Sequence, residues 1–297
     1  MARGTGRRPS PDDEKLARLR ALAGEPAAQR RYAEQVLELA RLPDTVRAAL
    51  AVLAAHPGPA LRGLLLHKYA WCAADSRKRD SGGAIRGLLL GALRPLATRD
   101  DLPLLERAAA TYEFRYGEVA GDLRAAALLT LQQVDDTLAG FHCVRLLTDE
   151  YTSPESGEPA LTSVRILAAQ GQVLPLYGYA IGSGHTFSEV LAESLRSLAG
   201  LPASLLPALV ERYRASDDEI VLLGLFDLLL AHDARADYLD VLFTFLRETG
   251  LLALYHSLVS TLVARRDPAL LARLEGLLRD ERDREKAALL RSALALR

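Results

Sequence analysis

The sequence contains few of the residues that usually provide covalent cross-links or bulk in a globular core. It has two cysteines, one tryptophan and one methionine in 297 residues, and aromatic residues make up only 6%. Hydrophobic residues still account for 49%, so the apolar volume is mostly Leu, Ala and Val, which suits close packing of helices. Cys72 and Cys143 lie far apart in apolar helical settings. We therefore expect buried free thiols in a reducing compartment and no disulfide framework.

Patterns typical of β-strands and of membrane segments are also missing. No run of alternating β-branched residues lies between turn signals, which argues against a sheet. The most hydrophobic stretch, 220–231, is too short to span a bilayer and is interrupted by Asp227. The arginines near the N-terminus are not followed by the apolar segment of a signal peptide. We expect a soluble, cytoplasmic protein that does not enter a membrane.

Motifs for catalysis or metal binding are absent as well. The six histidines have no i,i+4 histidine partner and no Cys-x-x-Cys accompanies them, so the sequence does not predict a zinc site. There is no Gly-x-Ser-x-Gly, and neither cysteine has an evident base partner. Asp233, Asp237 and Asp240 share a helix face, but acids near a helix start explain them. We expect no metal, no cofactor and no enzymatic activity.

Apolar helical segments are what the sequence has in abundance. Residues 118–134 place Arg124 inside an Ala/Leu run that is apolar on nearly every side, so this helix must pack between neighbours. Ser10, Ser216 and Asp267 are predicted N-caps. After a leading helix near 11–23, we predict first helices of successive pairs near 27–41, 58–73, 100–115, 136–148, 172–181, 202–214, 236–247 and 268–279. The second helices are predicted near 43–55, 83–97, 121–134, 159–170, 186–199, 217–231, 250–264 and 283–296.

A motif recurs at the start of two predicted second helices. It consists of an acid, four spacer residues, an aliphatic residue and an arginine, followed by an Ala/Leu run, and occurs at 80–86 and 118–124. Val46-Arg47 and Val164-Arg165 keep the last two positions without the acid. This motif resembles the second helix of HEAT repeats, including the short bacterial type found in phycobilin lyases. We expect the arginines to link adjacent repeats through the preceding acid or through carbonyls at helix ends.

Together, the helical periodicity and the resemblance imply an all-α fold. We expect a right-handed α-solenoid, an α-α superhelix of about eight HEAT-like helix pairs, in which residues 11–297 form a single continuous array. Residues 1–10 contain Arg3, Arg7 and Arg8 and too few apolar residues to fold, and are predicted to be a disordered basic tail.

Two clusters combine aromatic and basic residues. The first provides the candidate binding residues Lys68, Tyr69, Trp71, Arg77, Lys78 and Arg79. Cations beside exposed rings suit phosphate and base stacking or an acidic peptide, and the alternative is a packed pair of rings followed by a solvated loop. The second cluster provides Tyr112, Arg115 and Tyr116, and at least one ring must face the surface. Its alternative is a turn between repeats that is packed by its own rings.

Two predicted connections, 75–83 and 149–159, are long, polar and rich in Gly, Ser or Pro. In stacked helical arrays such insertions gather on one face, which often contacts a partner. Loop-length variation without a function is the alternative reading.

Charge is distributed unevenly along the chain. Residues 1–99 contain 18 Lys and Arg against 9 Asp and Glu, whereas residues 100–297 contain 19 against 29. We predict a non-enzymatic scaffold that binds a protein partner through its concave surface, in a salt-sensitive association. The alternative is a nucleic-acid-binding protein that resembles HEAT-like DNA alkylpurine glycosylases and uses the basic N-terminal third. A third hypothesis, a chromophore lyase, rests only on the type of repeat.

Overall fold

The computed structural model describes residues 10–56, 60–182 and 187–295. Within these ranges the chain forms eighteen α-helices joined by loops and 3-10 turns, and it contains no β-strand apart from an isolated bridge between Phe114 and Glu118. The all-α prediction is confirmed. The predicted tail lies outside the described residues except for Ser10, whose side chain caps the first helix. In the described part of the chain, no helix has the length and apolar character needed to cross a membrane.

The chain divides into two compact units, one ending at Ile166 and the other beginning at Leu167, so the division falls inside α10 (Ala160–Ala169). The other helices of unit 1 are α1 (Pro11–Ala21), α2 (Pro26–Leu39), α3 (Pro43–Ala55), α4 (Leu61–Ala74), α5 (Ser76–Arg79), α6 (Ala84–Leu93), α7 (Leu102–Ala109), α8 (Gly121–Val134) and α9 (Asp136–Leu147). Those of unit 2 are α11 (Val173–Ile181), α12 (Ser188–Arg196), α13 (Leu206–Tyr213), α14 (Glu219–Ala231), α15 (Leu239–Glu248), α16 (Leu252–Ala264), α17 (Pro268–Asp280) and α18 (Arg284–Ala295).

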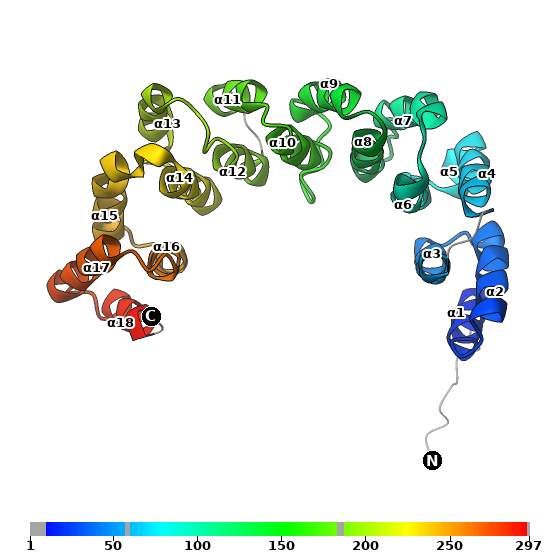
Figure 1. The fold of residues 1–297 in the computed structure, drawn as a ribbon, viewed down its shortest axis with the longest axis horizontal. Helices are drawn as coiled ribbons and strands as arrows, with labels where there is room; N and C mark the ends of the chain where they lie inside the picture. The colour runs from blue at the N-terminus through cyan, green and yellow to red at the C-terminus, as the bar shows by residue number, and fades with distance from the viewer. Residues whose placement is uncertain (1–9, 57–59, 183–186, 296–297) are drawn as a thin grey trace, which may run out of the picture. The chain divides into compact units, whose positions relative to one another are not determined.

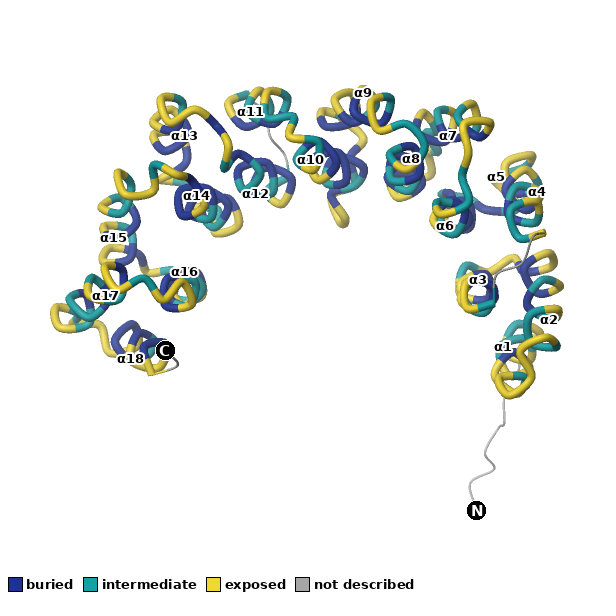
Figure 2. The backbone as a smooth tube through the Cα atoms, viewed as in Figure 1, coloured by how far each residue is buried: buried dark blue, intermediate teal, exposed yellow. Residues whose placement is uncertain are grey.

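Unit 1 consists of helices that pack against their neighbours in the chain and in the next layer. α2 packs on α3, α4 on α6 and α7 on α8, while α3 also contacts α6 and α6 contacts α8. The helices α3, α6 and α8 therefore form one row, flanked by α2, α4 and α7 (Figure 1). Leu53 on α3, Leu89 on α6 and Leu128 on α8 are buried, and all three helices include buried stretches, dark blue in Figure 2. Burial of such Leu side chains contributes about 1.5–3 kcal/mol each.

Unit 2 repeats this arrangement with its own row. α12 contacts α14, α14 contacts α16 and α16 contacts α18, while α11 packs on α12 and α13 on α14. α14 is buried over most of its length, including Phe226, in line with its nearly all-apolar sequence. Its closest neighbour is α12, because a Cβ on Gly224 would lie 2.6 Å from the Ala192 Cα.

Side-chain caps set the starts of several helices. Ser10 and Asp13 form a capping box at α1, and the Asp267 carboxylate accepts from the N–H groups of Ala269 and Leu270, so both of these N-cap predictions are confirmed. The predicted N-cap Ser216 is wrong. Asp218 caps α14 instead, and the Ser216 hydroxyl accepts from the Asp218 N–H.

Buried lysines cap helix ends in another layer. Lys68 Nζ on α4 donates to the carbonyls of Glu38 and Ala40 at the end of α2, both at 2.8 Å. Lys286 Nζ on α18 donates to the carbonyls of Leu246 and Arg247 on α15, both at 3.0 Å. These carbonyls have no partner inside their own helix and sit at the negative end of its dipole. Each lysine thus joins helices that are far apart in the sequence.

Candidate functional site: the loop edge of unit 1

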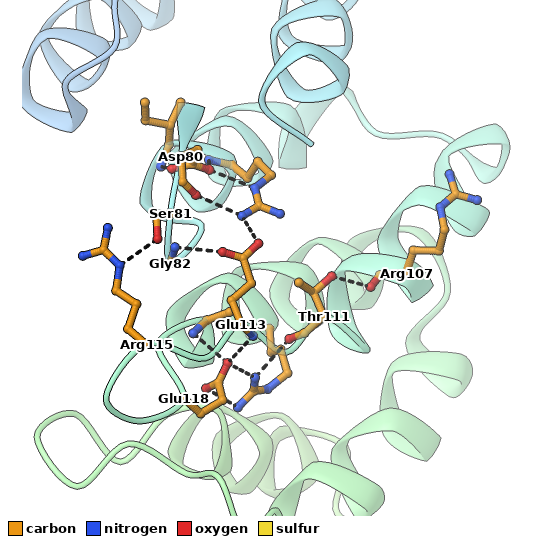
Figure 3. A network of polar contacts seen from close by, with 12 residues as sticks. Asp80, Ser81, Gly82, Arg107, Thr111, Glu113, Arg115 and Glu118 are labelled. Carbon is orange, nitrogen blue, oxygen red and sulfur yellow. Dashed lines mark hydrogen bonds and ion pairs between the residues drawn. The ribbon is translucent and has the colours of Figure 1, made fainter. Parts of the chain in front are cut away.

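Three loops of unit 1, residues 75–83, 110–120 and 149–159, contact one another in succession, and we call them the loop edge. The first two meet where Gly82 N–H donates to Glu113 Oε2 at 2.9 Å and Arg115 Nε donates to Ser81 Oγ at 2.8 Å (Figure 3). The second and third meet where Tyr112 OH donates to Asp149 Oδ2 at 3.2 Å. The predicted gathering of the two long loops on one side is therefore found within unit 1.

The first motif acid, Asp80, anchors the start of α6. Its buried carboxylate accepts from the N–H groups of Ile85 and Arg86, at 2.7 and 2.9 Å, and from Arg86 Nε at 2.9 Å. The chain turns back before the helix because Gly83 adopts a φ of 76°, where a Cβ would also lie 2.8 Å from the Leu123 side chain. The carboxylate thus serves as a cap for α6 and as a counter-charge for its arginine.

Arg86 also reaches the following helix pair. Its Nη2 donates to Glu113 Oε1 at 2.6 Å. Burial alone would lower the pKa of the Arg86 guanidinium, but its hydrogen bonds to Asp80 and Glu113 outweigh this and raise the pKa. Burial likewise tends to raise the pKa of Glu113, but the Gly82 N–H and Arg86 outweigh it and hold that pKa below its usual value. The pair is therefore a stable ion pair at neutral pH.

The second motif repeats the same geometry. Arg124 on α8 is fully buried, and its Nη1 lies 2.8 Å from Glu118 Oε1 and donates to the Thr111 carbonyl at 3.0 Å. Its Nη2 lies 3.3 Å from Asp149 Oδ2, in the next loop. The predicted contact of each arginine with the preceding acid is confirmed at Arg86 and Arg124, and both also reach an acid farther along the chain.

The other two motif arginines are exposed and not buried. Arg47 is exposed and pairs with Asp44 of its own helix at 2.8 Å, so the prediction is wrong there. Arg165 is also exposed. The acid six residues before the arginine is what distinguishes the two buried positions, because it supplies the counter-charge that burial of a guanidinium requires.

The outer side of the loop edge carries aromatic rings. Phe114 is 60% exposed, Tyr116 is fully exposed and Tyr151 is 40% exposed. The Phe114 and Tyr151 rings meet edge to face at 5.2 Å, and Tyr151 meets Tyr112 in the same way at 5.7 Å. Arg115 and Tyr116 are thus exposed as predicted. Tyr112 is half-buried, with the Arg124 guanidinium 4.2 Å from its ring centroid. This contact fits the alternative in which the Tyr112 ring packs the turn.

Sequence reasoning missed Phe114 and Tyr151 as members of this surface. Phe114 lies between the candidate residues Tyr112 and Arg115, and Tyr151 lies in the long polar connection 149–159. The sequence marked each of the two loops separately, one by its aromatic residues and the other by its length. What the sequence did not reveal was that the two rings meet.

The first predicted cluster is mostly internal. Lys68 and Tyr69 are buried, at 2% and 8% exposure, which corrects the expectation that they lie on a binding surface. Burial lowers the pKa of Lys68. Trp71 is half-buried, with Lys68 Nζ 4.3 Å and Arg79 Cζ 4.6 Å from its ring centroid. Their cation–π contacts occupy ring surface that a nucleic-acid base would need.

Of the three basic residues 77–79 that follow Trp71, one is held against the fold and two are exposed to solvent. Arg79 Nη1 donates to the Trp71 carbonyl at 2.7 Å, so Arg79 is held in place. Arg77 and Lys78 are exposed, and Lys78 Nζ lies 3.5 Å from an Asp75 carboxylate oxygen. Of this cluster, Arg77 and Lys78 remain accessible for binding a partner at the loop edge.

Two surface hollows lie away from the loop edge, one in each unit. A hollow of 560 Å³ in unit 1 is lined by Arg99, Asp135, Asp136 and Phe141 among others. One of 570 Å³ in unit 2 is lined by Arg214, Phe226, Asp240, Phe245 and Glu248 among others. Within the described ranges, no three His, Cys, Asp or Glu side chains are grouped so as to hold a metal ion.

Both cysteines are buried and free, as predicted. Burial raises the pKa of Cys72 to about 11 and that of Cys143 to about 12. Both therefore remain thiols at neutral pH, and neither has the thiolate character that a nucleophile needs.

Comparisons of the chain with protein-family models, with curated proteins and with solved structures found no match. The resemblance to HEAT repeats therefore stays a prediction carried by the motif residues at 80–86 and 118–124.

Proposed function

We propose that the protein is a non-enzymatic α-solenoid of about eight HEAT-like helix pairs that binds a protein partner through the concave face of its second helices. The observation that carries this proposal is the packing of second helix on second helix, α3 to α6 to α8 in unit 1 and α12 to α14 to α16 to α18 in unit 2. In such an array each layer contacts only its neighbours, and the exposed side of the row offers many modest contacts.

Exposed polar side chains on these second helices would make the contacts. They include Asp44 and Arg47 on α3, Asp122 on α8, Glu189 on α12, Glu219 on α14 and His256 on α16. Exposed acids occur on second helices of both units, and residues 100–297 as a whole contain 29 Asp and Glu against 19 Lys and Arg. A partner that follows the row meets mixed charge first and negative charge later, so its association is expected to weaken with salt.

The experiment is affinity capture from a lysate of the native host with the tagged full-length chain, followed by identification of the retained proteins. The charge reversals Arg47→Glu and Glu219→Arg change the proposed face, and Arg20→Glu on α1 serves as a matched surface control. We expect a specific protein that is retained by the wild type and the control and lost with the two face variants. Equal retention by all four proteins contradicts the proposed face.

The nucleic-acid alternative is less well supported. Lys68 and Arg86 are buried and the Trp71 ring is in contact with cations, so these three groups are already engaged inside the fold. Titration of labelled duplex DNA at increasing salt tests it. Binding at low salt that falls steeply as salt rises would favour this alternative over the protein scaffold.

A further inference from the structure

Large apolar rings face solvent on the loop edge, although the loops that carry them are tightly held. Phe114, Tyr116 and Tyr151 form the aromatic patch, and the first and last of these touch at 5.2 Å. Exposed rings clustered in this way are uncommon outside contact sites, and Tyr and Arg are enriched among residues that dominate binding energy.

In the loop 110–120 the two acids face inward, whereas Phe114 and Tyr116 at its tip are exposed. Glu113 bonds Arg86 and Gly82, and Glu118 bonds Arg124 and also accepts from the Ala120 N–H at 2.8 Å (Figure 3). These contacts fix the backbone on both sides of the tip at 114–117. A surface fixed before binding loses little conformational entropy when a partner docks.

Charge on the outer side indicates what kind of partner fits. Arg115 and Arg77 are exposed and form no ion pair with a carboxylate among the described residues, whereas Lys78 Nζ lies 3.5 Å from an Asp75 carboxylate oxygen. The acids of the same loop are neutralised by Arg86 and Arg124. The tip around Tyr116 therefore presents apolar rings beside the positive charge of Arg115, and Glu150 places a negative charge at the Tyr151 hydroxyl.

We propose that the loop edge docks an acidic segment of a partner protein, with a large apolar side chain of that segment seated on Phe114 and Tyr116 and its carboxylates on Arg115 and Arg77. This inference rests on the proposed function, in that the protein binds partner proteins. It assigns a surface distinct from the face of the second helices.

The same edge disfavours nucleic acid. Glu150 and Glu155 are exposed in the loop 149–159, beyond Tyr151. A phosphate backbone that continued along the edge would meet these carboxylates, whereas a short acidic peptide need cover only the region of Arg77, Arg115 and Tyr116. Like charges placed opposite one another select against the wrong partner.

The test is an array of glutamate-rich peptides, each with one central Phe, Trp, Tyr or Leu, probed with the labelled full-length chain, beside a matching array with lysine in place of glutamate. The strongest binders are then measured in solution by fluorescence anisotropy at low salt. We expect binding to glutamate peptides only, and affinity lowered about tenfold or more by Arg115→Glu and by Tyr116→Ala. Arg31→Glu, an exposed site on α2 with the same charge change, should retain wild-type affinity.

Melting temperatures of the variants are measured in parallel, and we expect them to stay close to that of the wild type because Arg115 and Tyr116 are exposed. Absence of peptide binding overturns the loop-edge proposal, as does an equal loss with Arg31→Glu. Binding of labelled single-stranded or duplex DNA that Arg115→Glu abolishes also overturns it. If no peptide binds but a host protein is still captured, the loop-edge proposal is wrong and the proposed face of the second helices is unaffected. If peptides bind but no host protein is captured, only the proposed function is contradicted.

Discussion

Arg86 Nη2 and Glu113 Oε1 lie 2.6 Å apart and join two successive helix pairs, because Arg86 belongs to α6 and Glu113 follows α7. Arg124 on α8 makes the corresponding contact with Asp149, which follows α9. Each buried arginine thus bridges the acid six residues before it and an acid in the next loop. The contacts that couple the layers of unit 1 are the same contacts that shape the loop edge.

Replacing Arg124 by alanine should strongly destabilise the protein. Glu118 and Asp149, whose side chains are 3% and 4% exposed, would remain buried without their counter-charge. Breaking a buried pair in this way costs about 3–5 kcal/mol. Urea unfolding followed by the fluorescence of Trp71, the single tryptophan, measures the effect in unit 1. Arg47→Ala is the control, because its side chain is 64% exposed and its loss should cost less than about 0.5 kcal/mol.

A double-mutant cycle tests the link between layers directly. Arg86→Met and Glu113→Gln remove the two ends of one ion pair, so the double variant should lose less than the two single variants combined. We expect a coupling energy of about 0.5–3 kcal/mol from urea unfolding. A second cycle that pairs Arg47→Met with Glu113→Gln should be additive to within about 0.5 kcal/mol, because Arg47 pairs only within α3. Additivity in both cycles would contradict the link.

Two carboxyl groups of the loop edge should affect stability in opposite directions as the pH changes. The folded pKa of Glu113 lies below its ordinary value of 4.5. Its stabilising contribution is therefore present above pH 4.5 and is lost as the pH falls through the lower folded value. Burial raises the pKa of Glu158 above 4.5, although hydrogen bonds with Thr162 lower it in part. Stability associated with Glu158 is thus present below pH 4.5 and is lost as the pH rises through its folded value.

Glu113→Gln should consequently lower the free energy of unfolding at neutral pH and flatten its fall in acid. Glu158→Gln should raise the free energy of unfolding at neutral pH, and this gain should disappear in acid. Unfolding titrations with urea across this pH range measure both. Parallel pH profiles for the two variants would show that the loop carboxyls do not carry these shifts.

Helix positions follow well from the sequence where local signals decide them. The predicted helices 43–55 and 121–134 coincide with α3 and α8 from end to end. Pro43 sets the start of α3 because its ring suits the first helical turn, and an apolar pattern of helical period continues to the end of each helix. The all-α class needs no more than these signals.

Local pattern fails where a distant partner decides the structure. The predicted helix 100–115 ends at Ala109 in the structure, although its helical pattern continues. Residues after Ala109 leave the helix and place Glu113 against Gly82 and Arg86, about thirty residues earlier in the chain. Helical periodicity contains no information about such a pairing.

The candidate site likewise combines features that the local sequence predicts with features that depend on distant contacts. That at least one ring of the second cluster faces the surface could be predicted, because adjacent large side chains cannot all face inward, and Tyr116 is such a ring. Burial of Lys68 could not, since a lysine usually lies at the surface and this one is retained inside by two carbonyls of α2.

The close approach of α12 and α14 provides a last prediction, in which two opposing effects can be separated. Alanine favours a helix interior over glycine by about 0.8–1.0 kcal/mol, so Gly224→Ala would stabilise α14 if there were space. A Cβ there would lie 2.6 Å from Cα and 2.7 Å from the carbonyl oxygen of Ala192, which are backbone atoms that cannot rotate away.

We therefore expect Gly224→Ala to lower the melting temperature, because the two helices must separate. Gly178→Ala in α11 is the matched control, since nothing lies within 4 Å of a Cβ at that exposed position. It should stabilise the protein by about 0.4–1 kcal/mol. Thermal unfolding followed by circular dichroism compares the two variants with the wild type. A rise in melting temperature with Gly224→Ala would mean that α12 and α14 do not pack as closely as described.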